Sequence, residues 1–216
     1  MSKVPSAKTL LNELDQDCLK FILMDKPKQV KVRQVLQWLD QNDEAAKKHL
    51  IDVIYHRLHR RYIVPLAKIR KKYRSGFLMM ATACLMIETL QSFYEGLPDT
   101  KGESKATFDK FFKREKELFP ELASHVAIFY YDVRCGILHQ AEIRGGVRIW
   151  RDKGTPLFDP INRIIKAREF MIALKTSLYN YIDALKRSDT KDKIWKNAHT
   201  KLIHICKNCS KSQISK

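Results

Sequence analysis

Apolar residues recur every three or four positions along nearly the whole chain, which is the spacing of an amphipathic helix. The period is clear in three stretches of the N-terminal part: Leu10–Ile22, Val35–Leu39 and Leu50–Tyr62. Pro27 and Pro65 follow the first and third stretches, and each is expected to end or kink a helix. Glycine and proline number only seven each, too few for the many turns of an all-β fold. The pattern therefore predicts an all-α chain.

The most apolar segment, Phe77–Phe93, is apolar on nearly all sides and is predicted to be a central buried helix. Gly96 suits the position just after the end of that helix. Ser104 is expected to cap a short helix. That helix carries three phenylalanines: Phe108, Phe111 and Phe112.

Pro120 is expected to begin a further helix that reaches about Gln140. The helical period then stops, because residues 143–160 contain three glycines and two prolines. Apolar and polar residues alternate in 147–149, and 157–158 follows after a turn. A small hairpin or an ordered loop is predicted there.

A long helix is expected over 161–185, and the apolar positions beyond Ser188 allow one more. The fold predicted from these elements is an antiparallel helical bundle with a small Gly-rich hairpin or loop inserted in it. The expected divisions are N-terminal helices packing on the bundle (1–65), the main helical domain (66–187) and a basic C-terminal tail (188–216).

The net charge of +17 arises from the two ends of the chain. Residues 1–75 and residues 161–216 carry +9 each, whereas residues 76–160 carry −1. Such an excess favours a polyanionic partner, which is RNA, DNA or an anionic membrane surface. A solvated, lysine-rich surface gives the same total and stays open as an alternative.

The N-terminus has neither the apolar core nor the small-residue cleavage site of a secretory leader. The longest apolar run, Phe77–Met86, is shorter than the roughly 20 residues that a membrane span needs. We therefore expect a cytoplasmic protein with no membrane partner. The five cysteines, an odd number, are expected to be reduced thiols.

Candidate chemistry lies late in the predicted helix before the Gly-rich segment, where Arg134 precedes His139 by five positions. RNA can be cleaved without a metal when a base takes the proton of the 2′-hydroxyl, an acid protonates the leaving 5′-oxygen, and a cation stabilises the charged phosphorane. Histidine can serve as base or acid near neutral pH. Arginine can hold two phosphate oxygens at once.

Helix geometry complicates this pair, because residues five apart lie about 140° apart around an ideal helix. Arg134 and His139 are therefore not expected to share a face. Asp132 and His139 are seven apart and should share one, so Asp132 could orient the imidazole while Gly136 loosens the helix. One histidine cannot easily be both base and acid, and two copies across a dimer axis would supply two.

An ordinary structural role stays open for the same residues. In that interpretation Arg134 pairs with a carboxylate such as Asp132 or Glu142, and His139 is simply a polar residue at a helix end.

The Arg-x4-His pattern late in a helix of a helical bundle resembles the HEPN superfamily, whose motif is an arginine, four to six residues and a histidine. The resemblance covers about residues 50–187. Four segments carry it: 77–81 (FLMMA), 84–91 (CLMIETLQ), 134–142 and 145–149 (GGVRI).

The resemblance implies a dimer of helical bundles in which two motifs face each other, with Arg134 and His139 as the active-site pair. Many members are metal-independent ribonucleases of toxin–antitoxin and anti-phage systems, so RNA, a second copy and an antitoxin or regulatory protein are the implied partners, with no cofactor. Other members only bind nucleotides or partners. The family often has Asn, Asp or His directly after the arginine, where this chain has Cys135.

Several residues are expected to support this site. Glu88 is a carboxylate in a mostly apolar helix and could face Arg134, either as a core pair or as a positioning group. The supporting residues expected in total are Asp132, Glu88, Cys135 and Gly136. Those expected to contact RNA are Arg144, Arg148, Arg151 and Tyr131.

Cys206 and Cys209, with His199 and His204 nearby, have the residue types of a zinc site. A single Cys-x2-Cys with irregular histidine spacing is weak evidence, and we predict no metal site here. The sequence has no phosphate-binding loop, no dinucleotide fingerprint and no nucleophile elbow.

Overall fold

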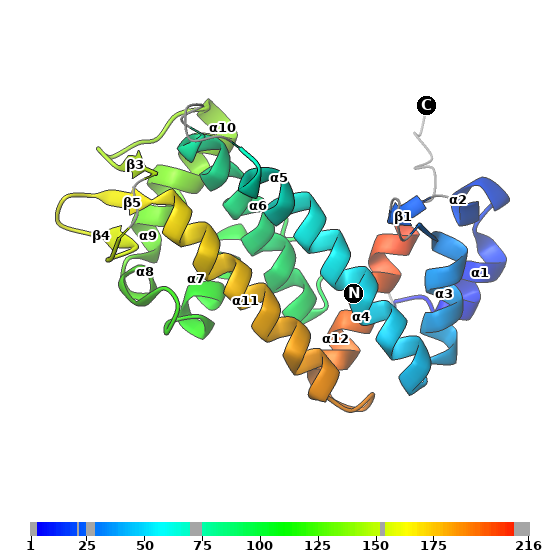
Figure 1. The fold of residues 1–216 in the computed structure, drawn as a ribbon. Helices are drawn as coiled ribbons and strands as arrows, with labels where there is room; N and C mark the ends of the chain where they lie inside the picture. Colours follow the sequence, from blue (N-terminus) through cyan, green and yellow to red (C-terminus); the bar gives the residue numbers. More distant parts are fainter. Residues whose placement is uncertain (1–3, 21, 25–28, 70–74, 152–153, 210–216) are drawn as a thin grey trace. The chain divides into compact units, whose positions relative to one another are not determined.

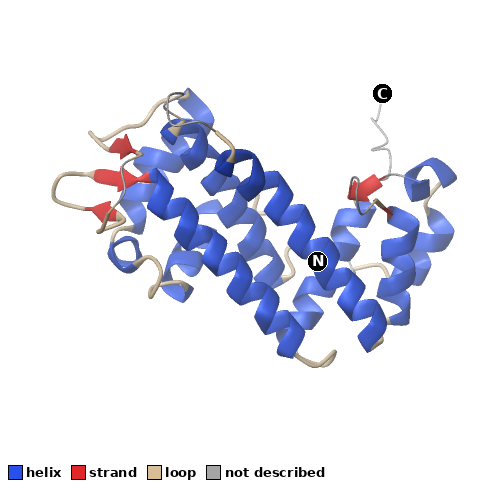
Figure 2. Cartoon of the chain, in the orientation of Figure 1, coloured by secondary structure: helices blue, strands red, loops and turns tan. Residues whose placement is uncertain are grey.

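The computed structural model describes residues 4–20, 22–24, 29–69, 75–151 and 154–209 (Figure 1). The chain is mainly helical, with a few short strands (Figure 2), which confirms the predicted fold class at that level. Its contacts divide it into two compact units. The first unit comprises Met1–Arg57, Ser92–Asp99 and Tyr181–Lys216, and the second comprises Leu58–Gln91 and Thr100–Asn180.

The N-terminal part of the first unit contains short helices and a two-stranded antiparallel sheet. Its elements are α1 (Ala7–Glu13), α2 (Gln16–Lys20), β1 (Ile22–Met24), β2 (Val30–Lys31), α3 (Val32–Gln41) and α4 (Glu44–Leu58). The helical period over 10–22 thus belongs to two helices and a strand rather than to one helix. In α3 every third or fourth residue is buried, including Val35, Leu36 and Leu39, as the sequence predicts.

The C-terminal helix α12 (Lys193–Lys207) belongs to the same unit as these N-terminal helices. Trp195 is almost fully buried, and its Nε1 donates a hydrogen bond to Asn42 Oδ1 at 3.0 Å. Asn42 ends α3 in the left-handed conformation, with φ 47°. The sequence allows one helix within the basic segment 188–216, and α12 is that helix, with its apolar side buried in the first unit.

Lys201 of α12 is buried, with its Nζ donating to the carbonyl oxygen of Pro98 at 2.9 Å. Burial lowers the pKa of Lys201 to about 8; Asp99 opposes the shift and Arg57 adds to it. The unfolded chain keeps this proton to about pH 10.5. Between these two values the unfolded state binds more protons than the folded state, so the free energy of unfolding should rise with pH.

We therefore expect the wild type to gain stability relative to Lys201→Met as the pH is raised from 8 to 10. Urea denaturation at several pH values measures this difference. Lys196→Met, at an exposed position of the same helix, is the matched control and should run parallel to the wild type. A parallel profile for Lys201→Met would contradict the burial argument.

The second unit contains the segments that carry the candidate chemistry. Its elements are the π-helix η1 (His59–Ile63), α5 (Val64–Ala67), α6 (Gly76–Glu95), α7 (Ser104–Arg114), α8 (Pro120–Ser124), α9 (Val126–Ile128), the π-helix η3 (Phe129–Cys135), α10 (Gly136–Gln140), β3 (Arg148–Trp150), β4 (Phe158–Asp159), β5 (Ile164–Lys166) and α11 (Ala167–Arg187). Both α6 and α11 continue into the first unit.

Helix α6 is the buried helix that the sequence predicts, and Gly96 follows it with φ 69°. Among the described residues it alone is long and apolar enough to span a membrane by those two criteria, and 61% of its most apolar window is buried inside the protein. That burial agrees with a core role.

A cluster of phenylalanine rings fills the core of the second unit. Phe112 lies 5.1 Å from Phe129 and 5.5 Å from Phe119, measured between ring centroids, and Phe170 of α11 stacks on Phe129 at 5.2 Å. All four rings are fully buried. Offset and edge-to-face pairs of this kind add to the free energy gained by burying the rings.

Replacing Phe112 with alanine should lower the free energy of unfolding by about 3–5 kcal/mol, because a cavity replaces a ring that touches several others. Urea denaturation measures the loss. Ile161→Ala, at a side chain that is 90% exposed, is the control and should change stability by less than about 0.5 kcal/mol. An equal effect of the two substitutions would contradict this account of the core.

Three predictions for the second unit need correction. The single helix expected from Pro120 to Gln140 is interrupted at His125, where φ is −126°, and passes through η3. Of the two expected alternatives, a hairpin or an ordered loop, the hairpin between 147–149 and 157–158 is wrong, because β3 and β4 do not pair with each other. Strand β5 lies between them, parallel to β3 and antiparallel to β4. Lys153, which belongs to the turn predicted between 147–149 and 157–158, lies outside the described residues. The long helix begins at Ala167 rather than at Ile161.

Candidate functional site

Arg134 lies in the last turn of η3, and its guanidinium is held by Glu88 of α6. Arg134 Nε donates to Glu88 Oε1 at 2.9 Å, and Nη2 lies 2.8 Å from the same oxygen. Only 13% of the Arg134 side chain and 17% of the Glu88 side chain are exposed. The predicted contact between these residues is present, in the form of a largely buried ion pair.

Two hydroxyl groups complete the surroundings of the Glu88 carboxylate. Ser104 Oγ donates to Oε1 at 2.9 Å, and Thr100 Oγ1 donates to Oε2 at 3.0 Å. The sequence predicts Ser104 as the cap of α7. In the structure Ser104 is the first residue of that helix, and its hydroxyl donates to Glu88 instead. Both carboxylate oxygens are therefore engaged.

Burial opposes the charge on Arg134, but the hydrogen bonds and negative charge of Glu88 outweigh it and raise the pKa of the guanidinium above its ordinary value. The ring of Tyr130 lies 5.6 Å from Arg134 Cζ, close enough for a cation–π contact. Arg134 is thus a permanent cation in a fixed place.

Arg134 and His139 meet within one chain, since Arg134 Nη1 lies 3.1 Å from His139 Nε2. A guanidinium can only donate, so Nε2 must accept this hydrogen bond. The geometry therefore corresponds to a neutral imidazole whose proton is on Nδ1. The His139 side chain is exposed. The pair therefore consists of a largely buried guanidinium and an accessible imidazole.

The expectation that Arg134 and His139 do not share a face is wrong, and the reason is η3. A π-helix joins residues five apart by its hydrogen bonds, whereas an α-helix joins residues four apart. The wider turn changes the rotation between Arg134 and His139 from its α-helical value and lets the long arginine side chain reach the imidazole.

The same change removes Asp132 from the role predicted for it. Its carboxylate pairs with Arg163 at 2.5 Å instead of orienting His139. A side-chain carbon at Gly145 would collide with this ion pair, and Gly145 has φ 60°. Asp132 therefore fixes the loop before β3, and the backbone N–H of Arg144 also donates to the carbonyl oxygen of Asp132 at 2.9 Å.

Gly136 begins α10 directly after η3 and is buried. A Cβ at this position would lie 2.5 Å from the carbonyl oxygen of Glu142, where the chain turns back against the helix. Gly136 is thus needed for close backbone approach, and its role is to permit this turn. Cys135, which follows Arg134, is a half-buried free thiol.

The residues expected to contact RNA lie in different surroundings. Arg144 is exposed beside α10, and Tyr131 is 52% exposed with its ring against Tyr130. Arg148 donates to the carbonyl oxygen of Asn162 and lies over the ring of Trp150. Arg151 lines a separate pocket described below. Arg144 and Tyr131 are therefore the members of this set that are exposed on segments adjoining the Arg–His pair.

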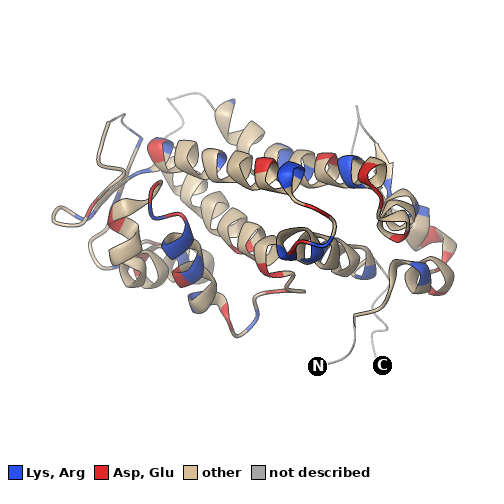
Figure 3. Cartoon of the chain, turned by 90° about the horizontal axis from the view of Figure 1, so that it is seen from below, with Lys and Arg blue, Asp and Glu red and all other residues tan. Residues whose placement is uncertain are grey.

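Basic side chains are not confined to the neighbourhood of this pair. Figure 3 shows basic and acidic positions interspersed along many helices. The net charge predicts an attraction for polyanions, and this attraction has to come from the exposed basic side chains.

The cysteines and histidines of α12 do not gather into a metal site. Within the described part of the chain, no group of three or more His, Cys, Asp or Glu residues could hold a metal ion. Cys206 is buried, Cys209 Sγ bonds to the carbonyl oxygen of Ile205, and His199 Nε2 lies 2.9 Å from the carbonyl oxygen of Leu39.

Sequence reasoning missed Thr100, Ser104 and Arg163. A hydroxyl in a loop or at a helix start gives no pattern that marks a carboxylate partner far along the chain. The sequence predicts a helix at Arg163, but this residue lies just before β5 with φ 53°. The signal that does exist is Glu88 itself, because a carboxylate in an apolar helix requires partners.

Comparison with known proteins adds no assignment: no protein-family model matches the chain, and no curated protein or solved structure matches it.

Glu88→Ala should lower the free energy of unfolding by about 3 kcal/mol, because it leaves the Arg134 guanidinium largely buried without its counter-charge. Urea denaturation measures this. Glu117→Ala, whose side chain is 87% exposed, is the matched control and should have little effect. The double variant Glu88→Ala with Arg134→Met should recover part of the lost free energy of unfolding. If the losses of the two single variants simply add in the double variant, a direct interaction between the pair is contradicted.

Proposed function

We propose that this chain is a metal-independent endoribonuclease of the HEPN type that leaves 2′,3′-cyclic phosphate ends. The observation that carries the proposal is the 3.1 Å contact between Arg134 Nη1 and His139 Nε2. It joins a fixed cation to an exposed imidazole, which are the two kinds of group that this chemistry needs. The resemblance of the Arg-x4-His segment to that family supports the same conclusion.

The chemistry follows from the tautomer of His139. A phosphate oxygen that accepts from Arg134 Nη1 replaces Nε2 as the acceptor of that donor. The lone pair of Nε2 is then released to take the proton of the 2′-hydroxyl. The 2′-oxygen attacks phosphorus, the bond to the 5′-oxygen breaks, and the guanidinium stabilises the extra negative charge of the phosphorane.

The leaving 5′-oxygen needs a proton from a second group. We propose that two copies of the chain pair so that the imidazole of His139 in the other copy, in its protonated form, supplies that proton. The proposal includes the antiparallel bundle arrangement of the helices that the family resemblance implies. It also includes a cytoplasmic role as a toxin or anti-phage effector, restrained by an antitoxin or another regulatory protein.

A non-catalytic module that binds RNA or a partner protein is the second candidate. Two observations favour it. Glu88 already occupies Nε and Nη2 of Arg134, so the guanidinium has fewer donors to offer a phosphate. Cys135 stands where the family often has a polar residue after the arginine.

The test is cleavage of labelled RNA in excess EDTA by the wild type, His139→Ala and Arg134→Ala. We expect the wild type to cut and His139→Ala to be at least 100-fold slower, since general acid–base catalysis contributes about 10²–10⁴-fold. Arg134→Lys keeps a cation opposite Glu88 and should also be slower, because a lysine lacks the planar fork of donors. End-group analysis should find 2′,3′-cyclic phosphates.

Controls separate the candidates. His49→Ala, at an exposed histidine in the first unit, should cut like the wild type. Equal cutting by all variants would mean that the Arg–His pair is not the site. If none cuts while the wild type binds RNA with an affinity that falls steeply with salt, the binding module is the better description.

A further inference from the structure

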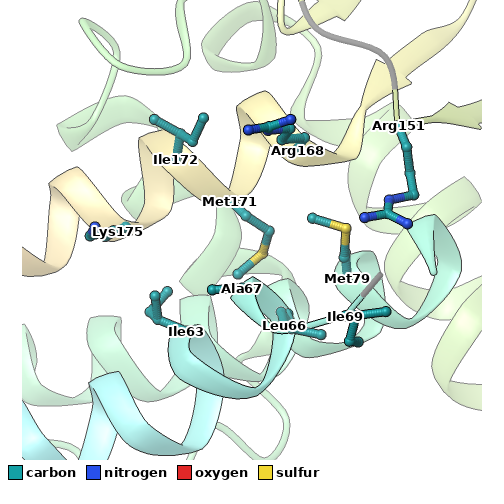
Figure 4. Close-up of a pocket in the computed structure, with 10 residues that line it drawn as sticks. All are labelled: Ile63, Leu66, Ala67, Ile69, Met79, Arg151, Arg168, Met171, Ile172 and Lys175. Atoms are coloured by element: carbon teal, nitrogen blue, oxygen red, sulfur yellow. The ribbon is translucent and has the colours of Figure 1, made fainter. Parts of the chain in front are cut away.

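A pocket of about 680 Å³ opens in the second unit among α5, α6 and α11 (Figure 4). Its volume lies within the range of roughly 300–1,000 Å³ that is usual for small-molecule sites. Glu88, Arg134 and His139 are not among the residues that line it, so it is distinct from the candidate Arg–His site.

One wall of this pocket is aliphatic. Its residues come from the end of η1 and from α5 and the turn after it: Ile63, Leu66, Ala67 and Ile69. Met79 of α6 and Met171 of α11 lie between this wall and the opposite side in Figure 4. Methionine side chains adapt to the shape of an apolar ligand because they are unbranched and polarisable.

The opposite side carries the charge. Arg151, Arg168 and Lys175 line the pocket, and none of the described residues that line it is an aspartate or glutamate. Arg168 and Lys175 are seven residues apart on α11 and therefore share a face of that helix. Arg168 is exposed, which leaves its guanidinium accessible at the pocket.

Arg151 is brought to the pocket by a close approach of β3 to the start of α6. A Cβ at Gly76 would lie 2.9 Å from Ile149 Cγ2 and 3.6 Å from Arg151 Cγ. Glycine at this position leaves room for the strand to pack against the helix. The placement of Arg151 is thus built into the fold of the second unit.

These features select the chemistry of a ligand. The aliphatic wall and the two methionines favour an aliphatic body. Among the described lining residues there is no aromatic side chain that could stack on a nucleobase. Arg168 and Lys175, on one face of α11, favour an anionic head group. We propose that this pocket binds an aliphatic amphipathic anion, a fatty acid, with the chain along residues 63–69 and the carboxylate at Arg168. The proposal is independent of RNA cleavage.

The experiment is isothermal titration of the full chain with dodecanoate, kept below its micellar concentration. We expect one site per chain. Across octanoate, decanoate and dodecanoate the affinity should rise by about fourfold per methylene while the pocket still has room. Dodecyl phosphate tests whether the head-group site prefers a phosphate, as in a lipid-derived ligand, or a carboxylate.

Two further ligands test the role of charge. Dodecanol and dodecyltrimethylammonium have the same chain with a neutral and a cationic head, and both should bind at least tenfold more weakly than dodecanoate. Equal binding of the three would show general adsorption to apolar surface and overturn the proposal. Absence of dodecanoate binding, or loss of the helical circular dichroism signal in place of saturable binding, would also overturn it.

Variants locate the site. Arg168→Glu should weaken dodecanoate binding at least tenfold, and Lys186→Glu, an equal charge change elsewhere on α11, should not. Ile172→Asp should weaken binding similarly; the side chain is 50% exposed, so the fold should tolerate the change. Ile161→Asp is its control. Unchanged binding in both pocket variants would place the ligand elsewhere and refute the assignment.

Discussion

The candidate site depends on one carboxylate, that of Glu88. It lies in the apolar helix α6, where an unpaired charge would be costly, and it accepts hydrogen bonds from Arg134, Thr100 and Ser104. These three partners belong to η3, to the loop before α7 and to the start of α7. This largely buried group thereby ties α6 to residues 100–104 and to η3. Its consequence for function is that Arg134 has a fixed position and a fixed charge before any ligand arrives, which is the condition for electrostatic stabilisation of a transition state.

The second constraint is the π-helix η3. With α-helical geometry throughout, Asp132 would share a face with His139, and Arg134 would lie about 140° away from it. In the structure the partners are exchanged: Arg134 reaches His139, and Asp132 pairs with Arg163. A local change in helix type therefore decides which of two charged side chains meets the imidazole. Isolated π-helical turns are frequent at functional sites for this reason, since they re-aim a side chain without ending the helix.

The apolar period was sufficient to predict α3, α6 and α12, because each buries a stripe or a whole circumference of apolar residues. It was not sufficient near Ile161, where the side chain fits a helical period but is 90% exposed and the following residues form β5. A short apolar run is compatible with either a helix or a buried strand, and pairing with β3 and β4 decides between them. For the site, Glu88 and Arg134 could be matched from sequence because a buried carboxylate needs a cation. Thr100 and Ser104 could not, because a hydroxyl accepts many partners.

The count of 41 lysines and arginines overstates the number of unpaired cations that a ligand meets. Arg134 is paired with Glu88, and Arg163 is paired with Asp132. Exposed arginines such as Arg144 and Arg168 are the ones that can attract a polyanion from a distance. A guanidinium fixed by a buried carboxylate cannot follow a moving phosphate, so a substrate has to be brought to Arg134 by other groups. The arginines that attract a polyanion are therefore different from the arginine that holds a phosphate in a fixed place. The net charge predicts the attraction, but it does not predict the place.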